Sequence, residues 1–323
     1  MRILFLRRCE KAVILPERKD VHAMELRHVL GNTWVAEANT ALLPVYKITE
    51  KDIVLIDTGY AKLDRSGLTA MIEDNGFHLR GVICSHAHFD HSGNVRYLQQ
   101  RCGARAAAHI IEAGISVNPD AYRANYVALT YGKSREYFLE ECFTADAIIG
   151  PEDEYLDFCG VRFGILPLPG HSAGHIGVVT PDNVAYVGDC LLDQQQIDSA
   201  KLPTSMFIAR DLQSKAFLRQ TDYPAYIIAH KAVVTDKTEL DALVDSNSEF
   251  IHRKADELLE DLADGMTFSQ WIAAFCQRES IRTKNEFKFS IIERNFANFV
   301  DWLTDEGRVT VQREYCAKTY YHG

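Results

Sequence analysis

The sequence predicts an α/β fold in its first two thirds, followed by a smaller and mostly helical part. Three observations support this prediction. Short apolar runs alternate with helical patterns between residues 33 and 110. Five further strand-like runs between residues 144 and 189 suggest a second sheet. From about Thr235 the pattern becomes helical. A chain of 323 residues that is 47% hydrophobic and 25% charged has room for two domains with a buried core.

The elements follow one another with recognisable boundaries. Strand-like runs lie within Thr33–Thr58, and Gly76 ends a helix predicted over Leu63–Asn75. The remaining elements of this part are a strand at 79–86, a helix at His91–Arg101, a strand at 104–110, a tyrosine-rich helical stretch at Pro119–Phe143, the five strand-like runs, a helix at 209–220 and a closing strand at 225–230.

The C-terminal part has three helical stretches and then a strand-like run, at 235–263, 267–279, 290–307 and 308–315. This order is that of a winged-helix-like module, so we expect a catalytic domain at 1–234 and a helical domain at 235–323. From Asp241 to the end there are 15 acidic and 10 basic residues. Since nucleic-acid binding needs clustered Lys and Arg, the favoured role is packing or formation of a homodimer.

Composition excludes several classes of protein. The formal net charge of −10 argues against a general nucleic-acid partner. No apolar run approaches the roughly 20 residues that cross a bilayer, so no membrane partner is expected. The first residues make a poor signal peptide, because Arg7 and Arg8 interrupt the apolar start. We therefore expect a cytoplasmic protein in which the eight scattered cysteines are reduced.

One segment carries most of the chemistry. In ICSHAHFDHSGN, an apolar strand runs directly into His86, His88, Asp90 and His91. Imidazole and carboxylate are ligands that divalent transition metals accept. His86 and His88 project the same way where the chain is extended, and Asp90 and His91 project differently. This division suggests two metal positions.

Three more candidates lie downstream, each shortly after an apolar run. They are His171, Asp189 and His230. Each alone has a blander interpretation, as a hydrogen-bonded polar residue or a turn residue. Together and in this order, at the ends of predicted strands, the seven side chains favour a metal centre.

This ordered set, with the upstream IDTG at Ile56–Gly59, resembles the metallo-β-lactamase superfamily over residues 33–235. The resemblance implies an αβ/βα sandwich of two mixed sheets flanked by helices, in the glyoxalase-II-like or small-hydrolase branch. It assigns the candidate residues as follows: His86, His88 and His171 to one metal, Asp90, His91 and His230 to a second, Asp189 as the bridge, and Asp57 as the group that orients a ligand imidazole.

The resemblance also implies a function. Two divalent ions, zinc first and iron or manganese as alternatives, would share a water whose pKa falls toward 7. The resulting hydroxide would attack a small ester, thioester, lactone or phosphoester, with Asp90 orienting it or moving a proton. Two alternatives remain open: a persulfide dioxygenase with one iron, and a phosphodiesterase acting on single-stranded RNA. A binding protein with a vestigial site is disfavoured by the complete ligand set.

Other candidates are less specific. His175 fits a hydrogen-bonded turn residue near the metals better than a ligand. Lys231 and Arg210 could hold an anionic group of the substrate, although a solvated surface charge is the commoner role of such residues. The tyrosine-rich stretch could line the pocket or belong to the core.

Overall fold

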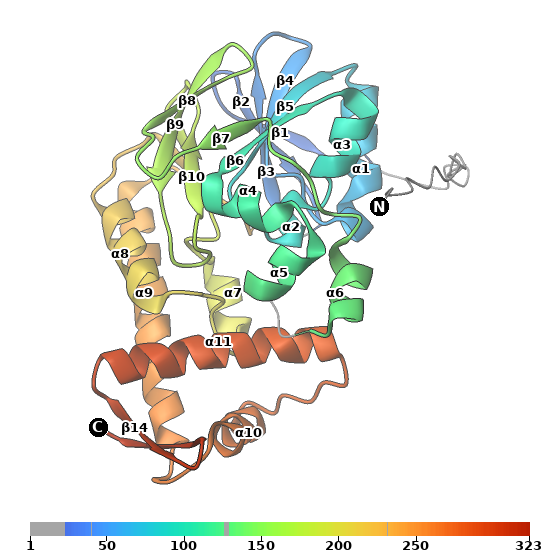
Figure 1. Cartoon of the computed structure of the whole chain (residues 1–323). Coiled ribbons are helices and arrows are strands. Elements are labelled where there is room, and N and C mark those ends of the chain that lie inside the picture. Colours follow the sequence, from blue (N-terminus) through green and yellow to red (C-terminus); the bar gives the residue numbers. More distant parts are fainter. Residues whose placement is uncertain (1–22, 40, 126–128, 231) are drawn as a thin grey trace, which may run out of the picture.

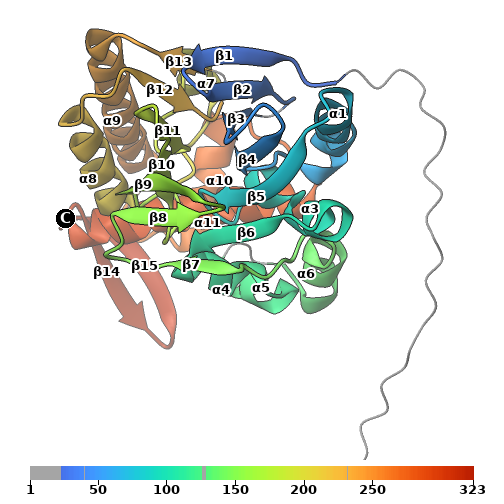
Figure 2. The same ribbon diagram turned by 90° about the horizontal axis from the view of Figure 1, so that it is seen from above.

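The computed structural model describes residues 23–39, 41–125, 129–230 and 232–323. Two sheets face each other, with helices outside both of them (Figures 1 and 2). One hydrophobic core joins the sheets and contains buried side chains from each, such as Val54 of the first sheet and Val178 of the second. The predicted sandwich of two mixed sheets flanked by helices is therefore confirmed.

The first sheet has seven strands in sequence order. Its strands are β1 (Leu26–Leu30), β2 (Thr33–Glu37), β3 (Leu42–Lys47), β4 (Asp52–Ile56), β5 (His78–Cys84), β6 (Arg105–His109) and β7 (Ala147–Ile149). The pairs from β1 to β4 are antiparallel, and those from β4 to β7 are parallel. Since β4 and β5 run side by side, their carboxyl ends carry Asp57 and His86 to one edge.

The second sheet has six strands in the order β13-β12-β11-β10-β9-β8. Their bounds are β8 (Tyr155–Phe158), β9 (Val161–Pro167), β10 (Ile176–Val179), β11 (Val184–Gly188), β12 (Ala225–Ile228) and β13 (Ala232–Val234). Only β11 and β12 pair in parallel, so their carboxyl ends deliver Asp189 and His230 to one edge. Here the two sheets meet, because Leu42 N–H donates to Ala229 O at 2.6 Å.

Helices of the first two thirds lie on the outer faces or at the edge that carries the candidate residues. They are α1 (Ala61–Asp74), α2 (Phe89–Ser92), α3 (Val95–Cys102), α4 (Ile110–Ser116), α5 (Pro119–Asn125), α6 (Tyr131–Phe138), α7 (Gln194–Ser199) and α8 (Ile208–Arg219). In Figure 2, α1 and α3 lie beside the first sheet, and α8 lies beside the second. Asp193 starts α7 with a capping box, in which its side chain accepts from Gln196 N–H.

The C-terminal part consists of α9 (Lys237–Glu260), α10 (Phe268–Arg278), α11 (Glu286–Asp305) and a hairpin of β14 (Val309–Glu314) and β15 (Ala317–His322). A separate apolar cluster holds them together around the buried Trp271, Phe296 and Phe299. The prediction of three helices followed by a strand is confirmed, with a second strand added. The winged-helix assignment and the domain boundary stay predictions.

Two sequence expectations need correction. Ala147–Ile149 belongs to the first sheet, where it pairs with β6, and not to the second. The single helix expected over His91–Arg101 is two helices, because Gly93 and Asn94 separate α2 from α3. A Cβ atom at Gly93 would lie 2.3 Å from Phe89 O and 2.8 Å from Ala61 N, so this tight joint requires glycine.

Candidate metal centre

The loop after β5 begins the candidate centre. His86 and His88 lie in this loop, and Asp90 and His91 lie in the short helix α2. All of them except Asp90 are buried. The hydrogen bond from His91 N–H to His88 O closes the turn that brings these side chains to one side.

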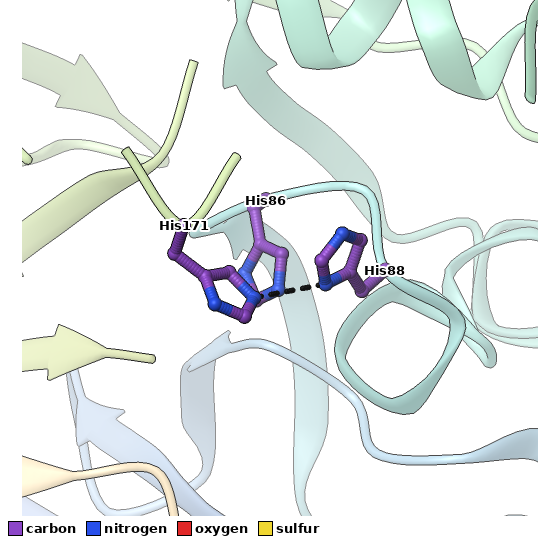
Figure 3. Close-up of side chains that lie close together, drawn as sticks. All are labelled: His86, His88 and His171. Carbon is purple, nitrogen blue, oxygen red and sulfur yellow. Dashed lines mark hydrogen bonds between the residues drawn. The ribbon is translucent and has the colours of Figure 1, made fainter. Parts of the chain in front are cut away.

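His86, His88 and His171 form the first cluster, which we call the three-histidine group. Each offers one ring nitrogen within 4.8 Å of the others. Figure 3 shows the three rings converging, with His171 Nε2 lying 2.9 Å from His88 Nδ1. The loops that carry them come from different sheets, since His171 lies between β9 and β10.

Hydrogen bonds orient two rings of the three-histidine group. His171 Nδ1 lies 2.8 Å from Thr204 O, which can only accept, so this nitrogen carries the proton. Ser85 Oγ donates to Asp57 Oδ2 at 2.6 Å, and it therefore accepts from His86 Nδ1 at 2.9 Å. In both rings the Nε2 lone pair is left facing the centre of the group.

Asp90, His91 and His230 form a second cluster, the mixed group, with one potential ligand atom each within 4.8 Å of the others. Its exposure differs from that of the first group. The side chain of His91 is fully buried, whereas those of Asp90 and His230 are 28% and 16% exposed. His91 Nδ1 donates to Asp57 Oδ2 at 2.9 Å, which leaves its Nε2 facing Asp189.

Asp189 lies between the two groups. Its Oδ1 is 3.1 Å from His91 Nε2 and 3.3 Å from His230 Nε2, and its Oδ2 is 3.4 Å from His171 Nε2. Although these distances are short, Oδ1 is a buried atom without a well-aligned hydrogen bond. This is the position that a carboxylate bridging two ions would need.

Asp57 holds both groups from behind. It is fully buried and accepts hydrogen bonds from Ser85 N–H, Ser85 Oγ, His91 Nδ1 and Tyr186 Oη. Its backbone is in the left-handed region, with φ of 61°. The carboxylate thus orients the ring of His91 directly and that of His86 through Ser85, and its role beside metal ligands stays a prediction.

His175 also faces the centre without joining either group. Its Nε2 accepts from the backbone N–H of Asp189 at 3.1 Å. Burial lowers the pKa of His175 to about 3, so the ring is neutral. A Cβ atom at Gly188 would lie 2.5 Å from His175 Nε2, so the close approach of the ring to this strand end requires glycine.

The pKa values of the candidate histidines are shifted in opposite directions in the two groups. Burial lowers the pKa of His86 and His88 well below the ordinary value, and the neighbouring imidazoles lower it further. Burial would also lower the pKa of His91 and His230, but Asp189 reverses this effect. The pKa of His91 is raised well above its ordinary value and that of His230 to about 9. Burial would raise the pKa of Asp189, yet the facing imidazoles hold it well below the usual range.

These residues fit divalent metal ions. The three-histidine group offers neutral imidazoles, and Asp189 is an ionised carboxylate; both are donors that zinc and related ions accept. The imidazoles of His91 and His230, whose pKa values are raised by Asp189, would release a proton on binding an ion. The Nε2 atoms of His86 and His91 are buried and have no hydrogen-bond partner in the described part of the chain. Because buried polar atoms are rarely left unsatisfied, an ion at each group would supply the missing partner.

A cavity of about 350 Å³ opens beside both groups. His88, Asp90, His171, Asp189 and His230 form one wall. The remaining walls come from α7, α8, α9 and α11 and from the segment between α7 and α8; they include Gln196, Thr204, Asp211, Lys215, Asn247, Phe250 and Ile291.

Of the two basic residues suggested for substrate contact, the structure describes Arg210. Arg210 is exposed and does not line the cavity, because its place on α8 turns it toward solvent. The next residue, Asp211, and Lys215 four positions later share the buried face and form an ion pair of 2.5 Å. Lys231 lies outside the described residues. Asp211 and Lys215 are four residues apart and so share one face of α8; this spacing could have indicated Lys215 from the sequence.

The sequence interpretation also missed Glu112, which is buried and hydrogen-bonded to both histidine-bearing loops. Its signal was a lone acidic residue in an otherwise apolar run after the strand at 105–109. The tyrosine-rich stretch contains both buried and exposed side chains. Tyr122 is buried and stacks on Phe138 with ring centroids 4.8 Å apart, whereas Tyr131 is exposed.

The fold and this candidate centre together define the class: an αβ/βα sandwich with a histidine-rich edge where its two sheets meet. A family model described as the metallo-beta-lactamase superfamily matches residues 44–232, which is more than half of the chain. The chain belongs to the metallo-beta-lactamase superfamily.

Similar proteins narrow the relationship. Hydroxyacylglutathione hydrolase GloC of Haemophilus influenzae is 30% identical over 145 residues, which are 44% of this chain and 62% of that protein. Hydroxyacylglutathione hydrolase of Ectopseudomonas mendocina is 28% identical over 130 residues, which are 40% of this chain and 39% of that protein. Both matches thus span less than two thirds of the relative.

Solved structures share the fold over a greater length. A metallo-beta-lactamase family protein from Thermus thermophilus aligns with a TM-score of 0.67 at 17% identity, over 93% of this chain and 99% of that one. The alignment therefore includes most of the C-terminal helices. In the described part of the chain, no helix combines the length and apolarity needed to cross a membrane.

Proposed function

We propose that this protein is a metal-dependent hydrolase whose substrate is a small acyl thioester or a related ester. The observation that carries the proposal is the convergence of two candidate ligand groups on Asp189 at the wall of one cavity. His86, His88 and His171 would hold one ion, and Asp90, His91 and His230 the other, with Asp189 between them. Zinc suits this set of nitrogen and oxygen donors.

Thioesters come first among the candidate substrates because of the relatives. Both hydrolases described above are named for hydroxyacylglutathione, a thioester. The thiol portion need not be glutathione, since Lys215 supplies the one ammonium group among the described residues that line the cavity, and it is paired with Asp211. A lactone or a phosphoester stays a second choice.

Each part of the wall would have its own task. Bound ions would act as Lewis acids and lower the pKa of a coordinated water to near 7. Asp90, partly exposed at the cavity, would accept the proton from the attacking water and give it to the leaving thiolate. Phe89 and Phe250 would exclude bulk water beside these groups.

We also propose that residues 235–323 form a separate helical domain which completes the cavity. Asn247, Phe250 and Ile251 of α9 and Ile291 of α11 line it. Asn247 is held in place by hydrogen bonds with Leu192 N–H and O. Substrate choice would then depend on this domain as well as on the metal ligands.

Metal content and substrate class can be tested together. We expect two zinc ions per chain, hydrolysis of a model acyl thioester, loss of that activity after chelation and its return on addition of Zn²⁺. The matching oxygen ester should be cleaved more slowly, because thiolate is the better leaving group. Full activity in the metal-free protein would contradict the mechanism. One iron per chain would contradict the proposed pair of zinc ions. Cleavage of phosphodiesters without thioester cleavage would contradict the substrate class.

A further inference from the structure

Glu112 is a buried acidic residue in the first turn of α4 that lies outside both candidate ligand groups. Its exposed fraction is 1%. Oε2 accepts from Ala87 N–H at 2.9 Å, and Oε1 accepts from Ser172 Oγ at 2.8 Å and Gly174 N–H at 2.7 Å. All three distances are those of well-formed hydrogen bonds to a charged acceptor.

The three donors belong to two loops that hold candidate ligands. Ala87 separates His86 from His88, and Ser172 follows His171 directly. The first loop leaves the seven-stranded sheet and the second leaves the six-stranded sheet. One carboxylate therefore joins the two loops that carry the three-histidine group.

The loop at Gly174 is shaped for this contact. A Cβ atom there would lie 2.3 Å from His109 Nδ1 and 3.1 Å from Glu112 Cγ. His109 itself accepts from Ile111 N–H at the start of α4. Glycine at 174 thus lets the second loop approach α4 closely enough for Glu112 to reach it.

Burial of this carboxylate is costly, because no ion pair to it is found among the described residues. Burial raises the pKa of Glu112, and its three hydrogen bonds partly offset the increase. A neutral side chain would avoid the cost but could not offer two acceptor atoms to three donors.

We propose that Glu112 is a positioning residue that sets the spacing between the His86–His88 loop and the His171 loop for metal binding. The inference rests on the proposed metal centre. Glu112 acts through Ala87 and Ser172 and touches neither substrate nor metal. Removal of such hydrogen-bond partners around a metal site reduces affinity about 10–100-fold.

The main variant is Glu112→Gln. Its amide oxygen can serve one loop, while its NH₂ group faces an N–H donor of the other loop. Asp182→Asn is the matched control, because Asp182 also joins turns of the two sheets, by accepting from Asn32 N–H and Thr33 Oγ1 at 2.8 Å each, away from the candidate ligands. Ser172→Ala removes one donor and leaves the carboxylate unchanged.

The measurement is Zn²⁺ affinity of the metal-free full-length protein, by competition with a chromophoric chelator. The visible spectrum of the Co²⁺-loaded protein reports ligand geometry. We expect Glu112→Gln to weaken Zn²⁺ binding at the tighter site about 10–100-fold and to alter the Co²⁺ bands. Ser172→Ala should do so by a smaller factor, and Asp182→Asn should change neither quantity.

The outcomes separate the two proposals. Wild-type protein that binds no Zn²⁺ contradicts the proposed metal centre. Wild-type protein that binds Zn²⁺, with unchanged affinity and spectrum in Glu112→Gln, overturns the role of Glu112. If Glu112→Gln does not fold, Ser172→Ala decides, since wild-type affinity and spectrum there would overturn the role as well.

Discussion

The two candidate ligand groups lie side by side but have different surroundings. The three-histidine group is buried, and Thr204 and Ser85 orient two of its rings. The mixed group has one fully buried member, His91, and two that face the cavity. Its rings also carry raised pKa values because they face Asp189.

Because of this difference, we expect the two groups to bind their ions with different affinities. A site with fixed, neutral, buried nitrogens loses little entropy on binding an ion, and we expect it to bind the tighter metal. A site with partly exposed ligands can exchange its ion and change its coordination as substrate enters. Replacing one histidine of each group by alanine tests whether the two groups differ in metal affinity.

The largest effect is expected for His171→Ala. This change removes the ring that meets His88 at 2.9 Å and leaves two donors of three in the buried group. Removal of a residue that only hydrogen-bonds a metal ligand costs up to about 100-fold. We expect His171→Ala to lower activity by more than this factor and to lose the more tightly bound ion. Bound zinc after dialysis and the rate of thioester hydrolysis measure this. His252→Ala, at an exposed position of α9, is the control. Retention of both metals would refute the assignment.

His230→Ala should have a smaller effect. The variant keeps the three-histidine group and should keep one zinc per chain, with activity lowered by a smaller factor than in His171→Ala. Metal content at several free zinc concentrations would show loss of the weaker ion alone. If both ions disappear together, the two groups bind cooperatively and the comparison between them fails.

Gly170→Ala tests whether the backbone next to His171 helps to position the three-histidine group. Gly170 has φ of 142°, and a Cβ atom there would lie 2.3 Å from Asp211 Cα. We expect a loss of about 1–3 kcal/mol in the free energy of unfolding, with weaker binding at the three-histidine group. Gly114→Ala in α4 is the control: its Cβ meets nothing within 4 Å, so stability should stay equal or rise. Equal stability of both variants would contradict the steric argument.

The smallest effect concerns Glu141, a buried acidic residue shortly after α6. Burial raises its pKa to about 7, with Lys62 and Arg65 opposing the shift and Asp90 adding to it. Because the folded-state pKa exceeds the unfolded one, stability falls as pH rises from about 4.5 to 7 and then levels off. The loss between pH 6 and 8 is about 1 kcal/mol.

Glu141→Gln should remove that part of the pH dependence, as measured by urea unfolding at several pH values. The zinc content of both proteins must be equal in this comparison. A variant whose stability depends on pH as strongly as that of the wild type would show that Glu141 is not the group responsible.

The sequence predicted the sandwich and the convergence of the seven candidate ligands, because each follows a recognisable strand or lies in one dense motif. Their role as ligands stays a prediction. Other features depend on contacts between distant segments. Thr204 orients His171 through a backbone carbonyl, which carries no sequence signal. Glu112 lies 60 residues from Ser172, so its two-loop contact could not be read from local pattern.

The incorrect expectations have physical causes as well. The three-residue strand at Ala147–Ile149 has too little pattern of its own to choose a sheet, and pairing with β6 decides its place. Arg210 was expected near the mouth of the pocket as a possible anion contact, but the turn of α8 directs Asp211 and Lys215 to the cavity and leaves Arg210 exposed.

The distribution of the candidate ligands along the chain affects how the protein is made. They extend from His86 to His230 and come from both sheets. A nascent chain exposes the first four long before the last has left the ribosome, so the two candidate ion sites cannot both be complete until His230 has been synthesised. Binding of both ions would therefore occur only after both sheets of the sandwich have been synthesised and packed together.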